Sequence, residues 1–132
     1  MASIFTRIIH GELPCYKIAE AEGYFAFLDI APVERGHTLV VPKKEVDYLF
    51  DLDEKTYAGL FTFSKKIAKA IEAVVPCERI GMTVLGLEVP HVHVHLVPLI
   101  DSSYINFGKA KLNLASEQME ALAAKIREKI EI

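Results

Sequence analysis

The segment PHVHVHLVP, residues 90–98, is the feature that most constrains what this chain can fold into. It spaces three histidines two residues apart and fills both gaps with valine: His91, His93 and His95. β-Branched residues favour strands, and successive side chains of a strand point to opposite faces. The segment therefore predicts a strand with three imidazoles on one face. The opposite face, which we expect to lie on the core, carries Val92, Val94 and Leu96.

The segments on either side of this strand predict a mixture of strands and helices. Aromatic and β-branched runs bounded by Gly and Pro indicate strands at residues 23–32, 36–42 and 79–86, the first two as a hairpin. A short helix at 5–10 and an edge strand at 15–19 are expected before them.

Two longer helices follow from apolar residues that recur every three or four positions. The first begins near residue 52, capped by Asp51 or Asp53, and ends before Pro76. The second covers 116–130, with Ser116 as its cap. Strands and helices do not alternate regularly, which favours a single α+β domain over residues 1–132 with a mostly antiparallel sheet.

Composition excludes several classes of function. The chain has 132 residues, 52% of them hydrophobic, and a net charge of −3, which argues against a general nucleic-acid-binding protein. No apolar run approaches the roughly 18 residues needed to cross a bilayer, and the first residues do not resemble a signal peptide. Cys15 and Cys77 form no CxxC pair. We therefore expect a cytoplasmic protein with reduced thiols and no membrane partner.

The three histidines admit three interpretations on residue chemistry alone. They are compatible with a polar strand face that has no function. They also suit a metal site, since imidazole is a common zinc ligand, with Glu88 or His37 as a candidate third ligand. Finally, a neutral imidazole is a good nucleophile near pH 7, so one histidine can attack phosphorus while its neighbours fix its tautomer and bind phosphate oxygens.

The sequence HVHVHLV matches the signature of the histidine triad (HIT) family, in which histidines alternate with hydrophobic residues. The segments IFTRIIHGELP and FLDIAPVERGHTLVVPKKEV also resemble the opening segment and central hairpin of that family. The resemblance covers about residues 3–100. It implies an antiparallel sheet of about five strands with two main helices, and a homodimer. The third position of the signature is a histidine, His95, and in this respect the sequence resembles the nucleoside phosphoramidate and dinucleoside polyphosphate hydrolase branches of the family.

The resemblance also implies a role for each matching residue. His93 would attack the α-phosphorus of a nucleotide and form a covalent nucleotidyl-histidine, which water then hydrolyses. His91 would orient His93, His95 would bind phosphate oxygens and assist the leaving group, and His37 would complete the cluster. Asp29 would accept hydrogen bonds from the ribose hydroxyls. The apolar slot around the base would be formed by Phe5, Ile8, Phe27 and Leu39.

Two segments depart from the family pattern. After Gly86, Leu87 and Glu88 stand where hydrolase members often carry Gln and Ser or Thr. The side chain of Leu87 has no hydrogen-bond donor, and an ionised Glu88 repels phosphate, which predicts slow turnover or an unusual substrate with a cationic leaving group. Ser3 and Thr6 occupy the places of a Cys-x-x-Cys zinc motif, so we expect no metal and no cofactor.

These observations favour an enzyme that hydrolyses a nucleoside 5′-phosphate derivative, such as a purine phosphoramidate. A nucleotide-binding module with weak turnover is the second hypothesis, supported by Leu87 and Glu88, and a small metal-binding protein is the third. Residues 101–114 carry no diagnostic pattern, and a tail of this length can reach the site of a partner subunit.

Overall fold

The computed structural model describes residues 2–101 and 103–131, and within them five strands form one antiparallel sheet in the order β1-β2-β3-β5-β4. This confirms the expected α+β architecture. The elements in chain order are α1 (Ile4–Ile9), β1 (Lys17–Ala21), β2 (Tyr24–Leu28), β3 (Thr38–Pro42), the 3₁₀ turn η1 (Leu49–Asp51), α2 (Glu54–Val74), β4 (Arg79–Thr83), β5 (Val94–Leu99) and α3 (Ser116–Glu128).

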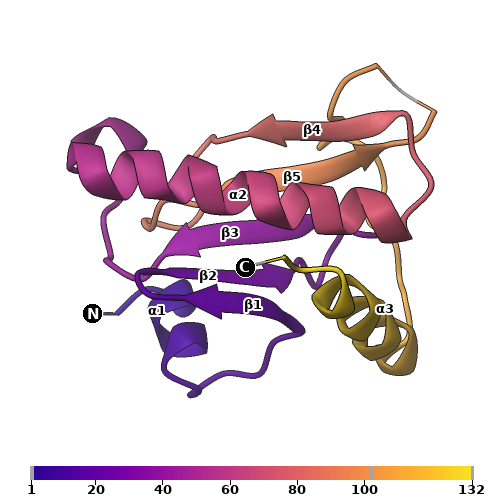
Figure 1. The fold of residues 1–132 in the computed structure, drawn as a ribbon, viewed down its shortest axis with the longest axis horizontal. Coiled ribbons are helices and arrows are strands. Elements are labelled where there is room, and N and C mark those ends of the chain that lie inside the picture. Colours follow the sequence, from indigo (N-terminus) through magenta and orange to yellow (C-terminus); the bar gives the residue numbers. More distant parts are fainter. Residues whose placement is uncertain (1, 102, 132) are drawn as a thin grey trace.

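The two long helices cover one face of the sheet (Figure 1). Helix α2 packs on β2 to β5, whereas α3 packs on β1 and β2 and touches α2. The stripes predicted from periodicity are buried there, with Leu60, Ile67 and Ile71 of α2 and Leu122 and Ile126 of α3 fully enclosed. None of the helices in the described residues is long and apolar enough to cross a membrane.

The ends of the helices correct one prediction. Asp53 caps α2 as expected, because its side chain accepts a hydrogen bond from the Thr56 N–H. The prediction that Ser116 caps α3 was wrong. Ala115 is the capping residue, and its N–H donates to Gln118 Oε1 at 2.9 Å. The Ser116 hydroxyl instead accepts a hydrogen bond from the Tyr16 hydroxyl, so a tertiary contact uses the group that we assigned to the cap. The helix ends at residue 128 rather than 130.

The first strand lies two residues further along the chain than expected. Strand β1 ends at Ala21, opposite Tyr24, so a two-residue turn joins it to β2. Gly23 in that turn has φ +92°, a conformation that glycine adopts at little cost and that suits a two-residue hairpin. Because the turn is this tight, pairing continues up to it, and β1 covers 17–21 instead of 15–19.

Strand β5 begins at Val94, three residues later than the predicted histidine strand. Strand β3 pairs Val40 with Val94 and ends at Pro42, which has no N–H to continue the ladder towards Val92. The Val92 N–H donates instead to the Val46 carbonyl at 2.8 Å. The expected alternation of faces nevertheless holds, since Val92, Val94 and Leu96 are all buried in the core beneath the helices.

Candidate active site

His93 lies on the sheet face opposite the long helices, and the residue is only 5% exposed. Its Nδ1 is 2.8 Å from the main-chain carbonyl oxygen of His91. A carbonyl only accepts hydrogen bonds, so Nδ1 carries the proton and Nε2 keeps its lone pair. The Phe5 ring and the imidazole of His93 meet edge to face with centroids 5.0 Å apart, which restricts rotation of the imidazole. In the neutral form of His93 this contact leaves the lone pair on Nε2, and the residue lines the neighbouring cavity.

His91 is fully buried and fixed at both ring nitrogens. Its Nε2 donates to the Pro42 carbonyl at 2.7 Å, which leaves Nδ1 to accept from the Ser3 hydroxyl, also at 2.7 Å. Glu45 accepts from the Ser3 N–H at 2.7 Å and from the Thr6 hydroxyl at 2.6 Å. Burial lowers the pKa of His91, in agreement with a neutral ring that both donates and accepts. The imidazole thus belongs to the N-terminal network, and its contact with His93 runs through the backbone.

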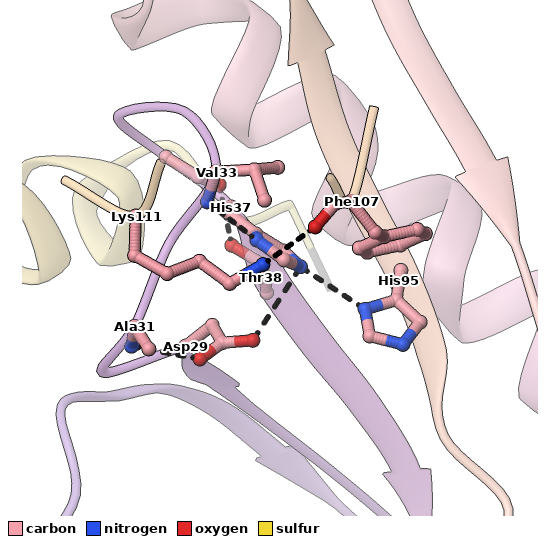
Figure 2. A network of polar contacts seen from close by, with 9 residues as sticks. Asp29, Ala31, Val33, His37, Thr38, His95, Phe107 and Lys111 are labelled. Carbon is pink, nitrogen blue, oxygen red and sulfur yellow. Dashed lines mark hydrogen bonds and ion pairs between the residues drawn. The ribbon is translucent and has the colours of Figure 1, made fainter. Parts of the chain in front are cut away.

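His37 and His95 form a second chain of hydrogen bonds (Figure 2). The Val33 N–H donates to His37 Nδ1 at 3.2 Å, so the proton of a neutral His37 lies on Nε2. That nitrogen is 3.0 Å from His95 Nδ1 and 3.5 Å from Asp29 Oδ2. The shorter contact assigns an acceptor role to His95 Nδ1, so His95 carries its proton on Nε2. A lone pair on His93 and an N–H on His95 are thereby available at the same site.

Both histidines of this chain are neutral at pH 7. Burial lowers the pKa of His37 to about 4, against a smaller opposing effect of Asp29. Burial also lowers the pKa of His95 to about 3, and the neighbouring His37, His93 and Lys111 add to the effect. The tautomers inferred from the hydrogen bonds require that both rings are neutral. The lowered pKa values of His37 and His95 agree with this requirement.

A cavity of about 270 Å³ opens beside these imidazoles. It is lined by Asp29, Ala31, His37, Leu85, Gly86, Leu87, Glu88, His93, His95, Phe107 and Lys111. Five residues expected in the site from the sequence are brought together here, namely His93, His95, His37, Asp29 and Glu88. Phe107 and Lys111 were missed, because the segment that carries them has no periodic pattern or motif.

Asp29 combines a local and a site-facing contact. Its Oδ1 accepts from the Ala31 N–H at 2.9 Å, which is the turn contact that an Asp after a strand commonly makes. Its Oδ2 faces His37 Nε2 in the cavity. One carboxylate oxygen thus fixes the side chain, and the other remains beside the histidines.

The four residues of the expected apolar slot lie on the histidine face but do not line this cavity. Phe5, Phe27 and Leu39 are buried in a second apolar cluster, against which Ile8 packs. The Phe5 and Phe27 rings meet edge to face with centroids 5.6 Å apart. Phe5 of this cluster contacts the ring of His93. The role of the four residues as a base-binding slot stays a prediction.

Metal ligation has one geometric candidate in the described part of the chain. The ligand atoms of Asp29, His37 and His95 all lie within 4.8 Å of one another. Two imidazoles and a carboxylate suit zinc in chemical type. In this structure, however, His37 Nε2 and His95 Nδ1 face each other in a hydrogen bond, so a metal there would have to replace that contact.

A family model for the HIT domain matches residues 10–101, which is more than half of the chain. The chain belongs to the HIT domain family. It is 35% identical to the adenosine 5′-monophosphoramidase hnt1 of Schizosaccharomyces pombe, with 98% of this chain and 99% of that protein covered. This confirms the resemblance drawn from the three histidines.

Solved structures of HIT proteins share the fold. A Hit-like protein from Bartonella henselae superposes with a TM-score of 0.84 at 31% identity, covering 96% of this chain and 95% of the other. A hypothetical histidine triad nucleotide-binding protein from Sulfolobus tokodaii gives a TM-score of 0.82 at 34% identity, with 96% of this chain and 90% of the other covered. Antiparallel sheet, helices and histidine strand therefore belong to a known HIT arrangement.

The segment in which this HIT chain departs from the sequence pattern forms part of the cavity wall. Gly86 has φ +78°, Leu87 is 94% exposed, and Glu88 is exposed. All three line the cavity. The wall that faces the histidines at this point therefore carries an apolar side chain and a carboxylate, and neither is a hydrogen-bond donor when Glu88 is ionised.

Proposed function

We propose that this chain hydrolyses a nucleoside 5′-phosphate derivative, most simply a purine phosphoramidate, through a nucleotide covalently attached to His93. The observation that carries the proposal is a pair of hydrogen bonds, from His93 Nδ1 to the His91 carbonyl and from His37 Nε2 to His95 Nδ1. In neutral rings they leave a lone pair on His93 Nε2 and an N–H on His95 Nε2. Membership of the HIT family and the similarity to a phosphoramidase of S. pombe support the reaction type.

In the first step, His93 Nε2 bonds to the α-phosphorus while the bond from phosphorus to the amine nitrogen breaks. The electron pair of that bond goes to the nitrogen, which takes up a proton from solvent. His93 becomes a cationic N-phosphoryl imidazole, and its Nδ1–H remains bonded to the His91 carbonyl. The N–H of His95 stabilises charge on a phosphate oxygen as it develops.

In the second step, a water oxygen attacks the same phosphorus and the bond to His93 Nε2 breaks. The electron pair returns to Nε2, the water proton passes to solvent, and a nucleoside monophosphate is released. Asp29 is suited to the ribose, because a carboxylate offers two acceptor oxygens to two vicinal hydroxyls. Glu88, which also lines the cavity, favours a leaving group that carries positive charge, such as an amine.

The test is incubation with adenosine 5′-phosphoramidate, followed by measurement of AMP. We expect His93→Asn to lower kcat by at least about 10⁴-fold, as removal of a nucleophile does in other enzymes, while AMP binding is retained. His10→Asn is the matched control, because His10 is exposed and outside the cavity. Equal hydrolysis by wild type and His93→Asn would show that the mechanism is wrong.

A nucleotide-binding module with weak turnover is the second candidate, favoured by the lack of a side-chain donor at Leu87 and at an ionised Glu88. AMP binding without release of AMP from the phosphoramidate would support it. The metal-binding alternative predicts stoichiometric zinc by elemental analysis, held by the cluster of Asp29, His37 and His95. A homodimer and a cytoplasmic location, both expected from the sequence, complete the proposal.

A further inference from the structure

The segment between β5 and α3 folds back over the histidines of its own chain. The Leu112 N–H donates to the Pro32 carbonyl at 2.8 Å, which ties the segment to the loop after β2. The Phe107 ring packs on His95 with centroids 4.8 Å apart and on His37 with centroids 6.1 Å apart. The segment therefore supplies one wall of the cavity in cis.

Lys111 extends from this segment into the cavity, where Figure 2 shows its side chain running past Asp29 and His37. Its Nζ donates to the Phe107 carbonyl at 3.1 Å and lies 5.8 Å from the centre of the Phe107 ring. An ammonium has three N–H donors, and the carbonyl uses one of them. Two donors thus remain for a ligand beside the histidines.

The charge balance of the cavity makes this ammonium distinctive. Among the described residues that line it, Asp29 and Glu88 are acidic and Lys111 is the one Lys or Arg. His37 and His95, with pKa values of about 4 and 3, add no positive charge at pH 7. A substrate phosphate in a cavity lined by two carboxylates needs a compensating cation, and the side chain of Leu87 offers it no donor.

We propose that Lys111 is the phosphate-binding cation of this site, with its ammonium bonded to a non-bridging oxygen of the nucleotide α-phosphate. The inference rests on the proposed function, because it assumes that a nucleotide occupies the cavity. It assigns to the segment after β5 a task that the family's polar residues before the triad would otherwise perform. Specificity for a phosphorylated ligand then depends on Lys111.

Equilibrium binding of AMP and of adenosine tests the proposal without turnover. We expect Lys111→Met to weaken AMP binding by about 10- to 100-fold, the range for loss of a charged hydrogen bond, and to change adenosine binding less than about twofold. Lys111→Arg should restore most of the AMP affinity. The control is Lys109→Met in the same segment, because Lys109 pairs with Glu34 and does not line the cavity.

Two outcomes would overturn the inference, and only one of them also contradicts the proposed function. If wild type binds AMP and Lys111→Met keeps the same ratio of AMP to adenosine affinity, Lys111 is not the phosphate ligand, although the proposed function stands. If wild type binds no AMP, both proposals fail together. Lys111 is exposed, so Lys111→Met should fold, and its thermal midpoint is compared with that of Lys109→Met.

Discussion

At the scale of single residues, the hydroxyl of Ser3 determines how the imidazole of His91 is held. It is the 2.7 Å donor to His91 Nδ1, and the alternative Thr6 hydroxyl, 3.4 Å away, already donates to Glu45. Ser3→Ala should leave a buried acceptor unpaired and lower the free energy of unfolding by about 1–3 kcal/mol. Urea denaturation measures this loss. The exposed Ser103→Ala is the control, and an equal effect of both changes would contradict the assignment.

The low pKa of His37 predicts how stability varies with pH. The folded value of about 4 lies below the unfolded value of 6.5, so the unfolded chain binds more protons between these values. The stabilisation is present in full above about pH 6.5 and is lost as pH falls towards 4. We expect His37→Asn to reduce this dependence by about 1–3 kcal/mol, in denaturation curves at pH 7 and pH 4.5. The exposed His10→Asn should retain the wild-type dependence, and an unchanged slope in His37→Asn would refute the prediction.

At the scale of elements, the start of α2 depends on one carboxylate. Asp53 accepts from the Thr56 N–H at 3.1 Å and from the Thr56 hydroxyl at 2.6 Å. Asp53→Ala should lower the free energy of unfolding by about 0.5–2 kcal/mol, whereas Asp53→Asn should lose less because it can still cap. Asp51→Ala is the matched control, since Asp51 lies in η1 and was the other cap candidate in the sequence. A larger effect at Asp51 in urea denaturation would reverse the assignment.

At the scale of the whole molecule, strand β4 is one edge of the sheet, and its outer backbone groups have no strand partner among the described residues. A second copy of the chain can satisfy such groups, which agrees with the homodimer implied by the family resemblance. Light scattering after size exclusion should then give twice the chain mass of 14.7 kDa at micromolar concentrations. A mass equal to one chain would contradict the dimer.

The sequence by itself determined the features that follow from short-range pattern. Alternation along residues 91–96 places the histidines opposite the valines, and periodicity over 54–74 gives α2 its buried stripe. Such patterns depend on the fixed geometry of strands and helices, so they are readable without a tertiary structure. The sequence also placed the cap of α2 at Asp51 or Asp53, and the structure selects Asp53 through its contact with the Thr56 N–H.

Only the tertiary structure decided which atoms surround each imidazole. The proton positions of His91, His93 and His37 depend on the Pro42 carbonyl, the His91 carbonyl and the Val33 N–H, and main-chain groups look alike at every position of a sequence. Phe107 and Lys111 reach the cavity because an irregular segment closes over the sheet, and no local periodicity records where such a segment packs. Local geometry follows from the types and spacing of neighbouring residues, whereas long-range contacts depend on the path of the whole chain.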